Sequence, residues 1–150
     1  MITLGLDNLK MVCGIKMKIH ESAENYLESI LMLSKSGNPV RSVDIANELE
    51  YSKPSVSVAM KNLREGGYIN VDADGYITLT ESGNKIAQDI YERHTLISDW
   101  LMFLGVSRAN AVQDACKMEH AMSDESYTAL RKHFDVLKLE MYKPKKAKNI

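Results

Sequence analysis

Two short amphipathic segments that follow one another almost without a break most constrain the fold of this chain. Apolar residues recur at helical spacing over residues 42–49 and again over residues 52–64. The second segment opens with Ser52 as a helix N-cap and places Pro54 in the first turn, where a missing N–H is harmless. Only two residues separate the two segments. Two helices joined so tightly predict a helix-turn-helix.

An alternating segment with a turn signal at its centre follows the two helices. In residues 68–80, Ile69 and Val71 alternate with polar residues before the turn 72–75, and Tyr76 and Thr78 alternate after it. That turn ends in Asp-Gly, which is typical of tight β-hairpins. A helix-turn-helix followed by a hairpin predicts a winged helix.

Helical periodicity surrounds this winged helix on both sides. The expected helices cover residues 22–36 with Ser22 as N-cap, residues 81–104 ending at Gly105, residues 107–122, and residues 123–134. Three helices after the wing exceed what a winged helix needs, and their apolar faces suggest dimerisation. We therefore expect a mainly α fold with a small β-hairpin wing: an N-terminal winged helix-turn-helix and a C-terminal helical dimerisation domain.

The composition is typical of a soluble globular protein and argues against a membrane-spanning or secreted, disulfide-bonded one. The chain is 45% hydrophobic and 26% charged, as is usual for soluble globular proteins. No apolar run approaches the roughly 20 residues that span a bilayer, and the start lacks a secretory signal pattern. Two cysteines, Cys13 and Cys116, do not make a disulfide framework. We expect a cytoplasmic protein without a membrane partner, whose net charge of −1 requires any DNA contact to come from a local basic surface.

The outward face of residues 52–64 is rich in hydroxyl and amine groups. Such groups contact phosphates and base edges, and a proline can contact a thymine methyl group in the major groove. The candidate DNA-binding residues are Ser52, Lys53, Pro54, Ser55, Ser57, Lys61 and Arg41. Outside a helix-turn-helix, the same residues would be read as a solvated helix surface.

A third pattern, Cys116-Lys117-Met118-Glu119-His120, predicts a metal site. Residues at i, i+3 and i+4 share one helix face, so a thiolate, a carboxylate and an imidazole can converge on one cation. This mixed donor set favours a transition metal over Ca²⁺ or Mg²⁺. The alternative is a small core cysteine beside a solvated Glu-His pair.

The stretch Cys116–Glu125, CKMEHAMSDE, resembles the metal-binding helix of the diphtheria toxin repressor and manganese transport regulator family, whose pattern is Cys-x-x-Glu-His-x-Met-Ser-Asp-Glu. The resemblance extends from about Lys18 to Phe134 and includes Glu92-Arg93-His94. It implies a metal-dependent transcriptional repressor of metal homeostasis, not an enzyme, in which Fe²⁺ or Mn²⁺ is the corepressor. The chain ends too early for the C-terminal barrel domain of longer members, so the resemblance is to the short form.

The resemblance also implies a ligand set. Its members are Cys116, Glu119, His120, His94, Glu28 and Asn25. Taken alone, His94 would be read as a hydrogen-bonded core histidine. Glu28 agrees with the manganese type and Cys116 with the iron type, whereas Asn25 stands where the former has aspartate and the latter methionine. Ser98 and Val112 replace the glutamate and histidine of the iron-type ancillary site. Co²⁺, Ni²⁺ or Zn²⁺ is expected to substitute in vitro.

These inferences divide the chain into four expected segments. They are an N-terminal extension that is non-native or disordered (1–16), a DNA-binding domain (17–80), a metal-binding and dimerisation domain (81–142) and a basic tail (143–150). The expected partners are a second copy of the chain and a palindromic double-stranded operator, with no small organic substrate. Three alternatives remain at this point: a metal-independent regulator sensing a small organic ligand, a metalloenzyme, and a winged helix used only for protein interaction.

Overall fold

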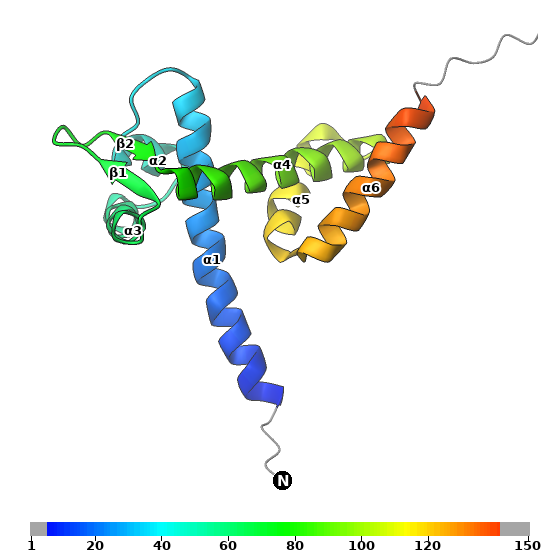
Figure 1. Ribbon diagram of the computed structural model, residues 1–150, viewed down its shortest axis with the longest axis horizontal. Coiled ribbons are helices and arrows are strands. Elements are labelled where there is room, and N and C mark those ends of the chain that lie inside the picture. The colour runs from blue at the N-terminus through cyan, green and yellow to red at the C-terminus, as the bar shows by residue number, and fades with distance from the viewer. Residues whose placement is uncertain (1–5, 142–150) are drawn as a thin grey trace, which may run out of the picture. The chain divides into compact units, whose positions relative to one another are not determined.

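The computed structural model describes the backbone of residues 6–141 and the side chains of residues 21–139 (Figure 1). The described elements are α1 (Leu6–Lys35), α2 (Ser42–Leu49), α3 (Lys53–Glu65), β1 (Ile69–Val71), β2 (Ile77–Leu79), α4 (Glu81–Phe103), α5 (Arg108–Ala121) and α6 (Asp124–Met141). The expected fold class, helical with one hairpin, is confirmed. None of the described helices is long and apolar enough to cross a membrane.

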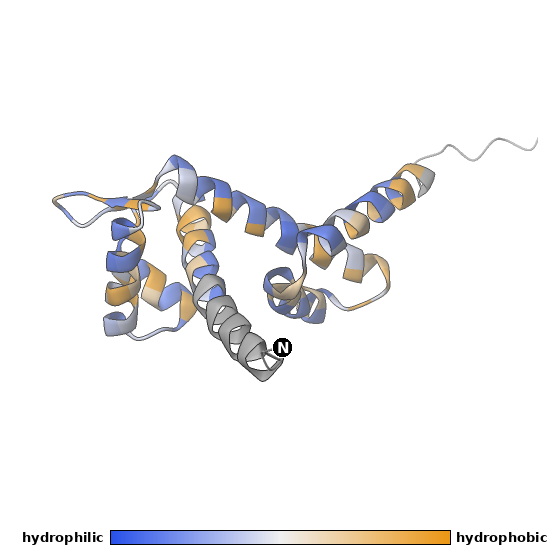
Figure 2. Cartoon of the chain, turned by 60° about the horizontal axis from the view of Figure 1, so that its bottom comes forward, coloured by the Kyte–Doolittle hydropathy of each residue, from blue (hydrophilic) through white to orange (hydrophobic). Residues whose placement is uncertain are grey.

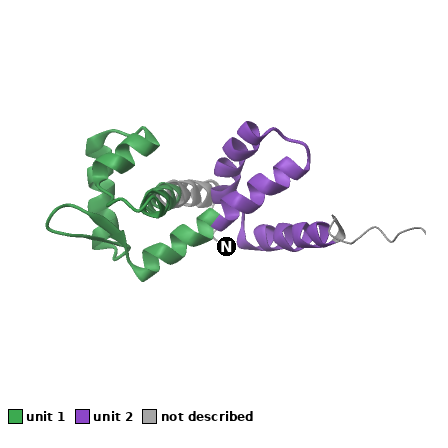
Figure 3. Ribbon diagram, turned by 90° about the horizontal axis from the view of Figure 1, so that it is seen from above, with its two compact units in different colours: residues 1–91 green, residues 92–150 purple. Residues whose placement is uncertain are grey.

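The chain forms two compact units, residues 1–91 and residues 92–150, which Figure 3 shows in green and purple. The boundary between them falls inside α4, so the first turns of this helix belong to one unit and its last turns to the other.

The core of the first unit is formed by α1, α2, α3, the hairpin and the first turns of α4, which contribute Ala87. The large side chains buried most deeply in the first three helices and the hairpin are Leu27, Ile30, Ile45, Val56, Ile69 and Ile77, all at most 2% exposed. Each contributes about 1.5–3 kcal/mol through the removal of its apolar surface from water. Because every element supplies at least one of these residues, the core fixes how α3 is presented.

The turn between α2 and α3 confirms the predicted helix-turn-helix. Glu50 adopts the left-handed conformation with φ of 55°, which ends α2 in one residue. The Ser52 hydroxyl then accepts a hydrogen bond from the Ser55 backbone N–H at 3.3 Å and caps α3, as the sequence predicts. At the other end of α2, the Asp44 carboxylate accepts from the Arg41 backbone N–H at 2.8 Å.

The hairpin confirms the predicted wing but corrects its register. Ile69 pairs with Leu79 and Val71 with Ile77, so the inward residues of β2 are Ile77 and Leu79 rather than the expected Tyr76 and Thr78. The cause is the turn: the Asp72 carboxylate accepts from the backbone N–H groups of Asp74 and Tyr76. Tyr76 therefore closes the turn, and the alternation begins one residue later than predicted.

Two helix boundaries also differ from the sequence-based expectation. Helix α1 begins at Leu6, so Ser22 lies within it and is not its N-cap. The preceding residues 6–21 contain one glycine and no proline, so nothing in them stops the helix. Helix α6 likewise continues past Phe134 to Met141, because residues 135–141 are mostly good helix formers. The predicted tail 143–150 lies outside the described residues.

The second unit packs the end of α4 with α5 and α6. Small residues, Ala111 and Ala115, are fully buried on α5, and Phe134 of α6 meets Phe103 edge to face with ring centroids 6.1 Å apart. Hydrophobic and hydrophilic residues alternate along α6 (Figure 2). Large apolar side chains nevertheless remain exposed on this unit: Phe103, Leu104, Val112, Val136 and Leu139.

Candidate metal centre and DNA-binding surface

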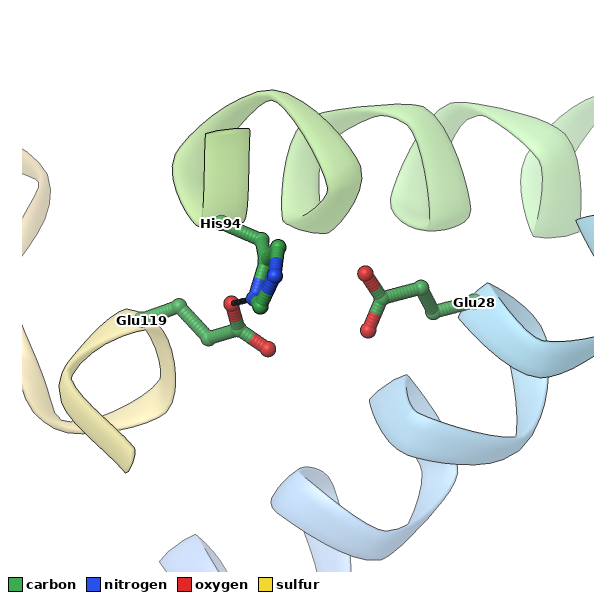
Figure 4. A group of neighbouring side chains, drawn as sticks. All are labelled: Glu28, His94 and Glu119. Carbon is green, nitrogen blue, oxygen red and sulfur yellow. Dashed lines mark hydrogen bonds and ion pairs between the residues drawn. The ribbon is translucent and has the colours of Figure 1, made fainter. Parts of the chain in front are cut away.

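A histidine–carboxylate pair lies at the centre of the second unit. His94 projects from α4 and Glu119 from α5, and Figure 4 marks their interaction with a dashed line. His94 Nδ1 and Glu119 Oε2 are hydrogen-bonded at 2.8 Å. The Glu119 side chain is fully buried, whereas that of His94 is 24% exposed.

The second oxygen of the Glu119 carboxylate is the most informative atom of the site. Oε1 is buried and has no hydrogen-bond partner. His120 Nε2 lies 3.3 Å from it, within ion-pair distance, but the contact does not have hydrogen-bond geometry. A buried charged oxygen left in this way costs about 1–3 kcal/mol or more. A buried carboxylate that contacts one imidazole through each oxygen, and has one oxygen without a hydrogen-bond partner, fits a divalent cation.

The packing of α5 explains why Glu119 and His120 point inward. Ala111, Ala115 and Glu119 recur every four residues and form the buried stripe of the helix. His120 extends beside this stripe, and its side chain is only 3% exposed. Cys116 lies at the edge of the stripe and is exposed. The structure therefore brings His94, Glu119 and His120 together, and the participation of Cys116 stays a prediction.

The remaining candidate ligands, Glu28 and Asn25, lie on α1 in the first unit, and both are half-buried. Figure 4 also draws Glu28. The two residues are three positions apart on one helix, so they share a face of α1. Their roles as ligands stay predictions.

The positions of the iron-type ancillary site carry no ligand chemistry here. Ser98 is buried with its hydroxyl unpaired, and Val112 is exposed on α5. Neither residue offers a charged or imidazole donor.

Asn25 also lines a cavity of about 670 Å³ in the first unit. Three tyrosines, Tyr26, Tyr51 and Tyr68, line the same cavity, together with residues of α3. Burial, and secondarily the neighbouring Tyr51, raises the pKa of the Tyr26 hydroxyl, so this group stays protonated at neutral pH. This cavity could not be predicted from sequence patterns, because its lining comes from four separate segments of the chain.

All the candidate DNA-binding residues are exposed: Ser52, Lys53, Pro54, Ser55, Ser57, Lys61 and Arg41. The Ser52 hydroxyl is already engaged in capping α3. The Arg41 guanidinium stacks over the ring of Tyr76 at 4.5 Å, which holds it at the base of the wing. Lys61 lies 3.9 Å from Glu65, an exposed contact of little energetic weight.

One exposed residue of α3 was missed by the sequence reasoning. Val58 is 61% exposed, an unusual position for a β-branched apolar side chain in a helix. The helical spacing could have predicted this exposure, because residues 56, 60 and 63 form the buried stripe and place position 58 opposite it. An exposed valine between Ser57 and Lys61 can contact a thymine methyl group.

A winged helix-turn-helix combined with a helical unit that holds buried histidine and carboxylate donors defines a class, the metal-responsive DNA-binding regulators. Comparison with known families agrees. Residues 18–76 match the N-terminal DNA-binding domain of iron-dependent repressors, and residues 80–145 match their metal-binding and dimerisation domain. The chain belongs to the iron-dependent repressor family, whose members are metal-dependent transcriptional repressors and not enzymes.

Individual relatives support the same assignment. An uncharacterised HTH-type transcriptional regulator of Methanocaldococcus jannaschii is 37% identical over 113 residues, which are 74% of this chain and 90% of that protein. The transcriptional regulator MntR of Escherichia coli is 37% identical over 111 residues, 74% of this chain and 72% of MntR. A manganese-dependent transcriptional repressor solved with manganese is 27% identical with a TM-score of 0.70. That match covers 75% of this chain and about half, 52%, of the solved chain.

Proposed function

We propose that this chain is a homodimeric repressor that binds a palindromic operator when Mn²⁺ or Fe²⁺ occupies the centre formed by His94, Glu119 and His120. The observation that carries the proposal is the buried Glu119 carboxylate: its Oε2 atom is hydrogen-bonded to His94, whereas its Oε1 atom lies near His120 and has no hydrogen-bond partner. A cation is the partner that such an oxygen lacks.

The remaining coordination positions are assigned to Cys116, Glu28 and Asn25. Carboxylates and imidazoles suit Mn²⁺ and Fe²⁺, whereas a thiolate shifts the preference towards softer metals. With Glu28 and Glu119 as ligands, the site suits Mn²⁺; with Cys116 deprotonated, it suits Fe²⁺ better. Co²⁺, Ni²⁺ and Zn²⁺ are expected to bind in vitro, because affinity rises towards the end of this series.

A ligand on α1 gives the cation its regulatory effect. Glu28 belongs to the DNA-binding unit, whereas His94, Glu119 and His120 belong to the dimerisation unit. Shared ligation links the metal to the placement of α3, and only the ligated form presents the two recognition helices of the dimer at the correct spacing. Half-sites of the operator then lie roughly 34 Å, or a multiple of it, apart.

The dimer uses the apolar surface of the second unit. Phe103, Leu104 and Leu139 are between 43% and 68% exposed, and the matched family domain is one of dimerisation. Large apolar side chains exposed in a domain matched to a dimerisation family are consistent with such an interface. Because the chain acts on DNA, we place it in the cytoplasm.

Isothermal titration of Mn²⁺ into metal-stripped protein tests the proposal. Glu119→Ala and His120→Ala should lose measurable Mn²⁺ binding and metal-stimulated DNA binding while remaining folded dimers. The matched control is His133→Ala, since His133 is an exposed histidine on α6 and its removal should leave binding unchanged. Normal binding of Mn²⁺ by both site variants would show that the metal centre is assigned wrongly.

A further inference from the structure

The residue preceding His94 makes contacts that the proposed metal centre does not use. The guanidinium of Arg93 donates one hydrogen bond to the Met122 carbonyl at 2.9 Å and forms an ion pair with the Asp124 carboxylate. The ring of Tyr127 covers its face, with 4.7 Å between the guanidinium carbon and the ring centroid. Only 14% of the Arg93 side chain is exposed.

These contacts hold both sides of the corner between α5 and α6. Met122 follows the last residue of α5 and caps that helix, and Asp124 is the first residue of α6. A cation at the C-terminal end of α5 and a carboxylate at the N-terminal end of α6 each oppose the partial charge of the helix end. Arg93 thus ties α4 to the corner through three different groups.

The chemistry of these contacts requires arginine rather than any cation. A planar guanidinium can donate in two directions and stack on an aromatic ring at the same time, whereas a lysine ammonium is a single point charge. Asp124 is 95% exposed, so its ion pair contributes little to stability. The ion pair does fix the direction in which the Arg93 guanidinium points.

Arg93 and the candidate ligands connect the same helices. His94 and Glu119 join α4 to α5 through one hydrogen bond, and a cation that binds to both groups takes its place. The Arg93 contacts use no candidate ligand atom and remain when that bond is lost. The last ligand of α5, His120, lies two residues before Met122, so movement of the corner would move Glu119 and His120 relative to His94.

We propose that Arg93 is a positioning residue of the metal centre: it clamps the α5–α6 corner against α4 and presets the separation of His94 from Glu119 and His120. This inference rests on the proposed function. Residues that orient metal ligands from outside the coordination sphere change affinity by about 10–100-fold when replaced.

The test compares Arg93→Lys with Arg131→Lys in the full chain. Arg131 is the matched control, because it also links α6 to α4, through Glu92 at 3.9 Å, but both partners are more than half exposed. Arg93→Lys should weaken Mn²⁺ binding by about 10–100-fold and alter the d–d absorption spectrum of bound Co²⁺, which reports ligand geometry. Arg131→Lys should change neither.

A second variant covers the case in which Arg93→Lys does not fold. Asp124→Asn alters an almost fully exposed side chain, so we expect it to fold, to change the Co²⁺ spectrum in the same direction and to weaken binding by a smaller factor. Wild-type affinity and a wild-type Co²⁺ spectrum in the folded variants would overturn the clamp while leaving the metal centre intact. Absence of Mn²⁺ and Co²⁺ binding by the unaltered chain would instead overturn the proposed function, and the clamp with it.

Discussion

Replacing Glu119 with methionine separates the functional role of this carboxylate from its contribution to stability. Methionine has a similar length and no polar atom that requires a strong partner. In the metal-free protein it removes a buried oxygen without a hydrogen-bond partner, which costs about 1–3 kcal/mol. It also removes the hydrogen bond from His94, but that ring is 24% exposed and can be solvated instead.

Together, the two effects predict that this replacement does not lower the free energy of unfolding of the metal-free protein. Removal of one member of a buried charged pair usually costs about 3–5 kcal/mol, because the charge of the other member stays buried without compensation. Here the group left behind is the His94 ring, which is 24% exposed and can be solvated, so we expect this cost to be small. We therefore expect Glu119→Met to unfold in chelator with a free energy equal to that of the unaltered chain or about 1 kcal/mol higher. With Mn²⁺ at one hundred times its dissociation constant, the unaltered chain should gain about 2.7 kcal/mol. The variant should gain nothing, so the order of the two stabilities reverses.

Urea unfolding followed by circular dichroism, at one fixed protein concentration because the chain dimerises, measures both quantities. Glu48→Met is the matched control: Glu48 is exposed on α2, and its replacement should change stability by less than about 0.5 kcal/mol in either condition. Loss of 2 kcal/mol or more by Glu119→Met in chelator would show instead that Glu119 is a structural residue of the metal-free protein. Retention of the full Mn²⁺ effect would refute its assignment as a ligand.

Three further predictions concern other parts of the chain. A Cβ on Gly83 would lie 2.0 Å from the Tyr68 carbonyl oxygen, so Gly83→Ala should lower stability by about 1–3 kcal/mol in thermal melts; unchanged melting would contradict this packing. Lys61→Ala should reduce the slope of log affinity for DNA against log salt by about 1 per subunit, and an unchanged slope would exclude a phosphate contact. Leu139→Glu should weaken the dimer in analytical ultracentrifugation, and a dimer of unchanged strength would place the interface elsewhere.

Local patterns in the sequence were sufficient for most of the fold. The N-cap at Ser52 and the Asp-Gly turn at residues 74 and 75 depend on neighbours within four residues, so they could be predicted directly. The start of α1 could not, because a serine competes weakly with a long run of helix-forming residues. The predicted alternation of the second strand was wrong for a related reason: the Asp72 side chain extends the turn to Tyr76.

The candidate site was predictable only in part. Spacing within α5 placed Glu119 and His120 near each other, but periodicity does not reveal which helix faces them. The pairing of Glu119 with His94 spans 25 residues, and it was expected only from the resemblance to a family. Complete burial of Glu119 and the isolation of its Oε1 atom depend on tertiary packing. The contacts of Arg93 could not be predicted for the same reason, since its partners Met122 and Asp124 lie 29 and 31 residues away.

Selection of DNA from a random duplex library, run in parallel with chelator and with Mn²⁺, tests whether the cation is the corepressor. We expect that only the Mn²⁺ selection enriches a sequence, that this sequence is palindromic, and that labelled copies bind in fluorescence anisotropy with Mn²⁺ but not with chelator. Glu119→Ala should enrich nothing in either condition. Enrichment of the same sequence, with equal affinity, in chelator would instead identify a regulator that acts without metal.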